Sequence, residues 1–323
     1  MIVYNIMKRI IISVLIISFL SIQPAYSYWI WTPKTGKWVN PKNLPKDNPQ
    51  EQLAYAKSFY EDNKYEEAKR EFRKLLKAYP KSAEAAESQY YLGLTCEQQG
   101  ILYEAYQAYQ MMIDKYPFSE RIQEVIEREY KIAEKFMAGE KRKAFGVTLP
   151  VDNPSIEIFG KVVENSTYGP LAPRAQYKLG LVLKGLLRYY EAEEEFNKVI
   201  SRYPDSEWLA AAKFQIASCR ASLSKGAAYD QGSAQEAKEK FEAFVKEHPD
   251  AVLSLDAEKN ISQIREKEAE ANYNIARFYE KQLALDSAKI YYNGIINNYA
   301  ESLWAAQAAA RLQIMERENE KKN

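Results

Sequence analysis

The chain has 323 residues, of which 45 are Lys or Arg and 44 are Asp or Glu. This near-neutral balance argues against a nucleic-acid-binding protein, which usually presents a strongly basic face. A single histidine, His248, excludes zinc motifs built on a histidine pair. The two cysteines, Cys96 and Cys219, fall within helical patterns, where we expect free buried thiols. An oxidising compartment also permits a disulfide bond if the two meet in space.

Residues 1–27 are predicted to be an export signal. Lys8 and Arg9 precede an apolar run of eleven residues from 10 to 20, and residues 25–27 (Ala-Tyr-Ser) offer small side chains to a signal peptidase. The run is shorter than the about 20 residues that span a bilayer, which disfavours a permanent membrane anchor.

We expect cleavage after Ser27, and either Met1 or Met7 serves as the start. Cleavage removes two basic groups and leaves 43 basic against 44 acidic residues. No cysteine lies near the cleavage site, so we do not expect a lipid anchor there. The mature chain is therefore expected to be exported to the periplasm and to be soluble unless another segment tethers it.

Residues 28–49 form a Trp- and Pro-rich arm and linker. The stretch "WIWTPKTGKWV" alternates aromatic and polar residues on both sides of a Pro/Gly turn, which predicts a short hairpin. Three interpretations of Trp29, Trp31 and Trp38 stay open. The side chains cap the exposed end of the first repeat, contact a partner or a lipid headgroup region, or are disordered.

A five-residue motif recurs along the rest of the chain. In most copies an aromatic residue precedes Pro, which ends a helix, and Ser follows two positions later, where it can cap the next helix. The copies are "AYPKS" at 78–82, "KYPFS" at 115–119, "RYPDS" at 202–206, "EHPDA" at 247–251 and "NYAES" at 298–302. We therefore expect Ser82, Ser119, Ser206 and Ser302 to act as N-caps at repeat boundaries.

Small and aromatic residues recur upstream of these boundaries at constant intervals. Two small residues twelve positions apart allow two helices to approach closely, and an aromatic residue four positions later fills the space beside them. The sets are Ala56, Ala68 and Phe72; Gly93, Ala105 and Tyr109; Gly180, Ala192 and Phe196; and Ala276, Ala288 and Tyr292. This spacing predicts an all-α tetratricopeptide-repeat solenoid built from helix–turn–helix units of about 34 residues.

Six units are expected between residues 50 and 315. Their approximate bounds are 50–81, 82–118, 119–169, 170–205, 206–250 and 251–301, followed by a terminal helix and a charged tail at 316–323. The third unit contains an insertion, "EKRKAFGVTLPVD", and the fifth contains a long connection, "SKGAAYDQGS". We expect the sixth unit to begin with a long helix that starts near Leu255.

The concave face formed by the first helices is predicted to bind protein segments. Tyr offers a large, rigid contact with one hydrogen-bonding end. The candidate residues are Lys57, Tyr60, Tyr90, Glu97, Tyr130, Glu134, Tyr177 and Lys184. In a chain with 25 tyrosines, the alternative for each single Tyr is ordinary packing between helices.

Motifs for catalysis are weak, and we expect no enzyme activity, no cofactor and no metal. Gly36-Lys37 lacks the other residues of a phosphate-binding loop. Four of the five residues at 191–195 are Glu at helical spacing, as on a solvated helix face. The basic run Lys141–Lys143 is either a solvated loop or a contact for an anion or headgroup.

The chain resembles the outer-membrane assembly factor BamD (YfiO) family. The resemblance rests on the "YP-x-S" boundaries, the first unit "YEEAKREFRKLLKAYPKS" and the late segment "YDQGSAQEAKEKFEAFVKEHPDA". It implies a periplasmic scaffold at the outer membrane that docks periplasmic domains of the β-barrel insertase and accepts segments of unfolded outer-membrane proteins. The family is usually lipidated on an N-terminal Cys and usually has five units, and this sequence departs from both features. The Trp-rich arm is a candidate replacement for the lipid.

Two other classes of function compete with this interpretation. A soluble periplasmic tetratricopeptide protein that coordinates the Tol–Pal and cell-division machinery fits the absence of a Cys at the cleavage site. Such proteins typically carry a coiled coil before the repeats, and residues 28–49 are too short and Pro-rich for one. A cell-wall hydrolase built on a helical solenoid needs a positioned acidic residue in a cleft, and no acidic residue of the sequence is singled out for that role.

Overall fold

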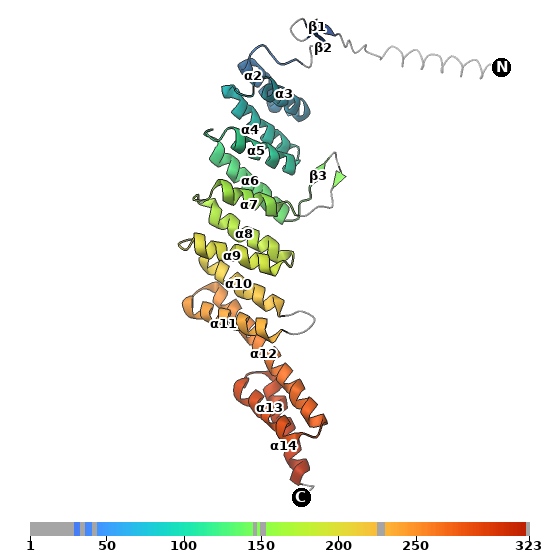
Figure 1. The fold of residues 1–323 in the computed structure, drawn as a ribbon, viewed down its shortest axis with the longest axis vertical. Helices are drawn as coiled ribbons and strands as arrows, with labels where there is room; N and C mark the ends of the chain where they lie inside the picture. Colours follow the sequence, from blue (N-terminus) through green and yellow to red (C-terminus); the bar gives the residue numbers. More distant parts are fainter. Residues whose placement is uncertain are drawn as a thin grey trace, which may run out of the picture. The chain divides into compact units, whose positions relative to one another are not determined.

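The structure, a computed structural model, describes residues 29–32, 36–40, 44–144, 147–148, 153–224 and 230–320. The predicted export signal lies outside these residues. Within them, thirteen helices form a tetratricopeptide-type solenoid, as predicted (Figure 1). The chain divides into two compact units, unit 1 at residues 1–99 and unit 2 at residues 100–323.

Unit 1 begins with the predicted hairpin. Strands β1 (Ile30–Thr32) and β2 (Lys37–Val39) pair antiparallel, with Trp31 opposite Trp38. Trp29, Trp31 and Trp38 are 57%, 48% and 66% exposed. Capping of the first repeat requires that these rings be buried against it, so that interpretation is wrong and the indoles face solvent.

Three helices complete unit 1. They are α2 (Pro49–Glu61), α3 (Tyr65–Ala78) and α4 (Ala83–Gln98). The side chain of Asn48 caps α2 by accepting a hydrogen bond from the amide of Glu51 (2.8 Å), and Pro49 occupies the first helical position, where no backbone donor is needed.

Unit 2 stacks further helices in chain order (Figure 1). They are α5 (Leu102–Lys115), α6 (Ile122–Met137), α7 (Ser155–Asn165), α8 (Leu171–Gly185), α9 (Tyr189–Arg202), α10 (Leu209–Leu223), α11 (Gln231–Glu247), α12 (Val252–Lys281), α13 (Leu285–Asn298) and α14 (Leu303–Glu320). The insertion between α6 and α7 contains a short antiparallel pair, β3 (Lys143–Ala144) and β4 (Val147–Thr148).

The interval pattern identified the core correctly. All members of the four predicted sets are buried, and the alanines and aromatic residues among them are fully buried. Gly180 shows why a small residue is needed, because a Cβ atom there would lie 2.6 Å from the ring of Phe196. The two helices of a hairpin therefore approach as closely as the sequence spacing requires.

The helix stops behave as predicted, but the caps do so only in part. The residue before the Pro position ends the preceding helix with the same backbone conformation in every copy, Tyr299 included, where Ala follows instead of Pro. Ser302 caps α14 by accepting from the amide of Ala305 (3.2 Å). Ser82 is the N-cap residue of α4, but its hydroxyl makes no such bond, and Ser206 lies two residues before the N-cap of α10, Trp208. The Ser119 hydroxyl lies 3.4 Å from the amide of Arg121, which is the N-cap residue of α6, so Ser119 does not cap the helix.

Helix α12 connects two hydrophobic cores of unit 2. Its 30 residues begin at Val252, slightly before the predicted start near Leu255. Ala257 and Ile264 pack in the core of α10 and α11, whereas Ala269 and Ala276 pack in the core of α13 and α14. Helix α14 continues to Glu320, so the predicted charged tail is helical over most of its length.

A buried carboxylate lies in α6. Glu129 is fully buried, and within the described residues neither of its carboxylate oxygens accepts a hydrogen bond of ordinary geometry. Burial raises the pKa of this carboxyl group to about 8, with Asp114 adding to the shift and Asn165 and Lys161 opposing it. The folded protein therefore holds Glu129 protonated near neutral pH.

We expect replacement of Gly180 by Ala to destabilise unit 2, because the new methyl group meets Phe196. Overpacking of this kind costs about 1–3 kcal/mol. Gly160 in α7 is the matched control, since a Cβ there has open space and Gly160→Ala should stabilise the helix by about 0.5–1 kcal/mol. Urea unfolding of both variants measures the difference, and equal effects of the two substitutions contradict the close packing.

Glu129→Gln is expected to raise the free energy of unfolding at pH 8 by on the order of 2 kcal/mol. The pKa of Glu129 is raised from 4.5 to about 8, so its favourable contribution is complete below pH 4.5 and is lost as pH rises through 8. Gln mimics the protonated acid, so the gain should shrink towards pH 5. Glu127→Gln, an exposed change on the same helix, should be nearly neutral at both pH values. If Glu129→Gln raises the free energy of unfolding equally at pH 5 and pH 8, the result argues against titration of Glu129 in this range.

Candidate functional site

All eight predicted binding residues lie on the first helices of the hairpins. Unit 1 contributes α2 and α4, and unit 2 contributes α6 and α8, followed by α10. We call the side chains that flank or link successive first helices the first-helix face. Lys57 and Tyr60 are on α2, Tyr90 and Glu97 on α4, Tyr130 and Glu134 on α6, and Tyr177 and Lys184 on α8.

Three of the four predicted tyrosines are core residues. Tyr90, Tyr130 and Tyr177 are only 4%, 4% and 8% exposed. The rings of Tyr130 and Tyr177 pack on Phe159 and Phe196, with centroids 5.5 Å apart in each pair. These rings have no free face for a ligand, so their predicted contact role is wrong and the packing alternative holds. Tyr60 is half-buried.

In unit 1, a cation joins the two first helices. Lys57 Nζ lies 3.0 Å from Glu87 Oε1 and 4.3 Å from the centroid of the Tyr91 ring. The rings of Tyr60 and Tyr91 meet edge to face at 5.4 Å. Glu97 lies half-buried further along α4. In unit 1 the first-helix face is therefore aromatic, and Glu87 neutralises the charge of Lys57.

In unit 2, Glu134 of α6 lies between two cations of α8. Its Oε1 atom is 3.6 Å from both Arg174 and Lys178, longer than a good hydrogen bond. The same oxygen accepts a hydrogen bond from the Tyr130 hydroxyl (2.9 Å). Burial, followed by this hydrogen bond, raises the pKa of Tyr130, so the hydroxyl stays a neutral donor.

Lys184 continues the polar links from α8 to α10. Its Nζ donates to Gln215 Oε1 (2.6 Å) and to Ser218 Oγ (2.7 Å). Gln215 in turn donates to the hydroxyl of Tyr177 (3.4 Å). Lys184 therefore holds two first helices at a fixed separation.

Three basic residues of α6 and α8 that the sequence prediction omitted are Lys131, Arg174 and Lys178. Lys131 of α6 is exposed, and the side chains of Arg174 and Lys178 on α8 are 44% and 24% exposed. One acid, Glu134, faces the two cations of α8 at long distance. Their remaining N–H groups can bind a carboxylate, for which Arg and Lys provide five and three donors. The sequence signal was available, since Lys131 and Lys178 directly follow the buried Tyr130 and Tyr177.

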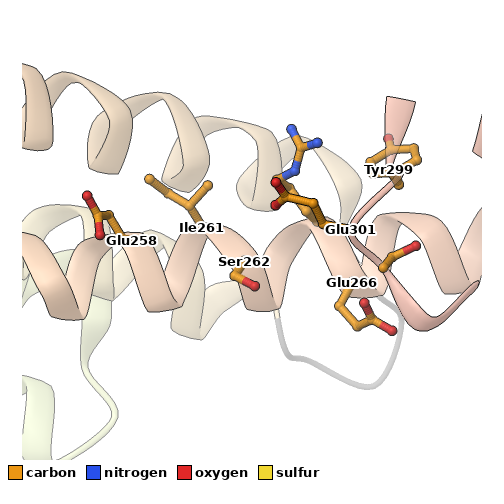
Figure 2. Close-up of a pocket in the computed structure, with 8 residues that line it drawn as sticks. Glu258, Ile261, Ser262, Glu266, Tyr299 and Glu301 are labelled. Atoms are coloured by element: carbon orange, nitrogen blue, oxygen red, sulfur yellow. The ribbon is translucent and has the colours of Figure 1, made fainter. Parts of the chain in front are cut away.

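A shallow pocket of about 170 Å³ lies between α12 and the loop that precedes α14 (Figure 2). Two of its polar groups, Arg265 and Glu266, already serve the fold. Arg265 donates to the carbonyl oxygen of Asn298 (2.8 Å), and Glu266 accepts from the amide of Leu303 (3.2 Å). We therefore regard this pocket as the junction that fastens α14 onto α12.

Searches for two other kinds of site were negative over the described ranges. No group of three or more His, Cys, Asp or Glu residues there is arranged to hold a metal ion. None of the helices between residues 49 and 320 combines the length and apolar character needed to cross a bilayer.

Comparison with family models supports the repeat fold and the family resemblance. Residues 224–323 match the model of the YfiO family, described as an outer membrane lipoprotein. Residues 53–120 and 174–206 match two tetratricopeptide-repeat models. The chain thus has a tetratricopeptide-repeat fold, and its C-terminal part is similar to the YfiO family.

Similar solved structures are also repeat proteins. MamA is 21% identical, with 62% of this chain and 92% of that chain covered at a TM-score of 0.34. The C-terminal part of a repeat protein from Cytophaga hutchinsonii is 18% identical, with 81% and 88% covered at 0.37. YrrB, a protein with an unusual peptide-binding site, is 18% identical, with 66% and 93% covered at 0.35. A search of curated proteins found no match.

Proposed function

We propose that the chain is a non-enzymatic envelope scaffold whose first-helix face binds protein segments during assembly of β-barrel proteins into the outer membrane. The YfiO match over residues 224–323 and the repeat matches support a BamD-like role. The partners are periplasmic domains of the β-barrel insertase and unfolded outer-membrane protein segments, met on the periplasmic side of that membrane. The predicted export signal supports this location.

The observation that carries the proposal is the pair of cations around Glu134. Arg174 and Lys178 are held 3.6 Å from one carboxylate oxygen, so neither forms a tight ion pair with it. A carboxylate of the bound segment, its C-terminus in particular, satisfies their remaining donors by charge-assisted hydrogen bonds. The half-buried Leu181 of α8 supplies apolar contact beside them. Tyr130 and Lys184 keep the helices in place.

The test compares two peptides from the last strand of an outer-membrane β-barrel protein, one with a free and one with an amidated C-terminus. Arg174→Gln with Lys178→Gln should lower the affinity for the free-carboxylate peptide roughly tenfold or more. Each charged hydrogen bond that is lost is worth about 1.5–3 kcal/mol. Isothermal titration calorimetry measures the affinities, and the amidated peptide should respond little.

The control carries the same charge change on a second helix. Lys240→Gln with Lys246→Gln alters two exposed residues of α11 and should leave both affinities unchanged. Equal binding of the free-carboxylate peptide to the parent and to the Arg174/Lys178 variant counts against the proposed site.

We also propose that the arm contacts the membrane or an envelope partner. Trp29, Trp31 and Trp38 expose about half or more of their surface on a hairpin, and indole rings favour the headgroup region of a bilayer. Trp31→Ser with Trp38→Ser should therefore shift the protein from the membrane fraction to the soluble fraction of the envelope. Phe118→Ser, which changes a 99% exposed aromatic residue of unit 2, is the control. Unchanged fractionation of the Trp variant excludes this role of the hairpin.

A further inference from the structure

The turns that join a first helix to its second helix share a left-handed residue. It is Asn63 (φ 59°), Gly100 (φ 70°) or Gly139 (φ 107°) in three turns, but Leu187 (φ 62°) and Leu283 (φ 61°) in two turns of unit 2. Gly and Asn adopt this conformation readily, whereas Leu is strained in it. The equivalent turns of the same chain therefore carry Gly or Asn, which are less strained in this conformation than Leu.

The two strained leucines are also exposed. Leu187 is 70% exposed and Leu283 is 81% exposed, and their neighbours Leu186 and Leu285 are 46% and 36% exposed. Each leucine thus combines backbone strain with an apolar side chain in solvent, and neither property stabilises the fold. Backbone strain of this kind tends to mark functional positions. The fold alone therefore does not account for these leucines, and we expect them to contact another molecule.

The edge of unit 2 that carries these turns is basic. Figure 1 shows the insertion with β3 and the α12–α13 turn on the same side of the unit, the right side of the drawing. Its turns, residues 138–144, 185–189 and 281–286, hold five basic and two acidic residues. Lys141 and Lys281 are exposed, Arg188 pairs with Glu191, and the Arg142 guanidinium stacks on the ring of Tyr103.

The opposite edge differs in charge rather than in apolar content. Phe118, Val252 and Leu303 are 99%, 84% and 76% exposed there. Its turns hold five acidic residues and one basic residue, over 116–121, 166–170, 203–208, 248–251 and 299–302. Strained leucines beside basic residues are thus a property of one edge.

We propose that the edge containing Leu187 and Leu283, the leucine edge, docks on an anionic lipid bilayer. The leucine side chains enter the interfacial region, and basic residues such as Lys141 and Lys281 contact headgroups. A bilayer fits this surface because its fluid interior accepts separate apolar tips without a shaped pocket, and the basic charge of the edge complements anionic headgroups. The proposal is independent of what the first-helix face binds.

The direct test places an environment-sensitive fluorophore at single positions. Leu187→Cys, Leu283→Cys and Val252→Cys, each labelled with a nitrobenzoxadiazole group, report the local polarity, and the native Cys96 and Cys219 are buried. With vesicles of phosphatidylethanolamine and phosphatidylglycerol, emission at 187 and 283 should shift to shorter wavelength, and emission at 252 should not. The readout is specific to each position, so vesicle binding by the apolar N-terminal residues does not confuse it. Absence of a shift at 187 and 283, or an equal shift at 252, overturns the proposal.

A second test uses the residue that the chain itself places in such a turn. Leu187→Asn with Leu283→Asn should weaken vesicle binding about tenfold, while Val252→Asn changes it little. The thermal unfolding midpoint of the double variant should not fall, because Asn63 shows that Asn suits this conformation. Three results contradict a lipid contact. The double variant binds vesicles as tightly as the parent protein, the parent binds phosphatidylcholine vesicles equally well, or the double variant loses a co-purifying protein without losing vesicle binding.

Discussion

The close approach of the two helices in each hairpin is the contact on which the rest of the structure depends. A single hairpin cannot bury its apolar stripe, so the helices must pack tightly on each other and on their neighbours. Gly180 against Phe196 shows how little space is left, since a Cβ atom would lie 2.6 Å from the ring. Once this contact is set, the first helices of each unit lie beside one another, and the turns between helices lie at the helix ends.

This contact explains why the fold could be predicted from the sequence and the caps could not. The interval between Ala56, Ala68 and Phe72 follows from hairpin geometry, and every repeat needs the same one, so repetition makes the signal strong. A cap depends instead on the rotamer of one hydroxyl group. The main-chain carbonyls of Ser82 and Ser302 both accept a bond from the residue three positions later, but only the Ser302 hydroxyl also accepts one.

The candidate face lies on the helices that the sequence indicated, but on two of them the exposed residue follows the predicted one. Successive residues of a helix are rotated by about 100°, so a shift of one position exchanges the core for the surface. Tyr130 and Tyr177 face the core, and the residues that follow them, Lys131 and Lys178, reach the first-helix face. Large tyrosines attracted the functional interpretation because Tyr is common in binding surfaces, whereas the same side chain also fills a gap between helices.

Because packing constrains only the buried residues of each helix, the two units can present different side chains on the same type of helical hairpin. Tyr90, Tyr130 and Tyr177 hold equivalent positions in the core, while the next residue is Tyr91 in unit 1 and Lys131 or Lys178 in unit 2. Since the core does not constrain that residue, its chemistry can be aromatic in one repeat and basic in another. The turns are equally unconstrained, which is how the fold tolerates Leu at a position where Asn63 and Gly100 are less strained. Stability thus resides in the hairpin contact, and recognition resides in residues that the contact leaves free.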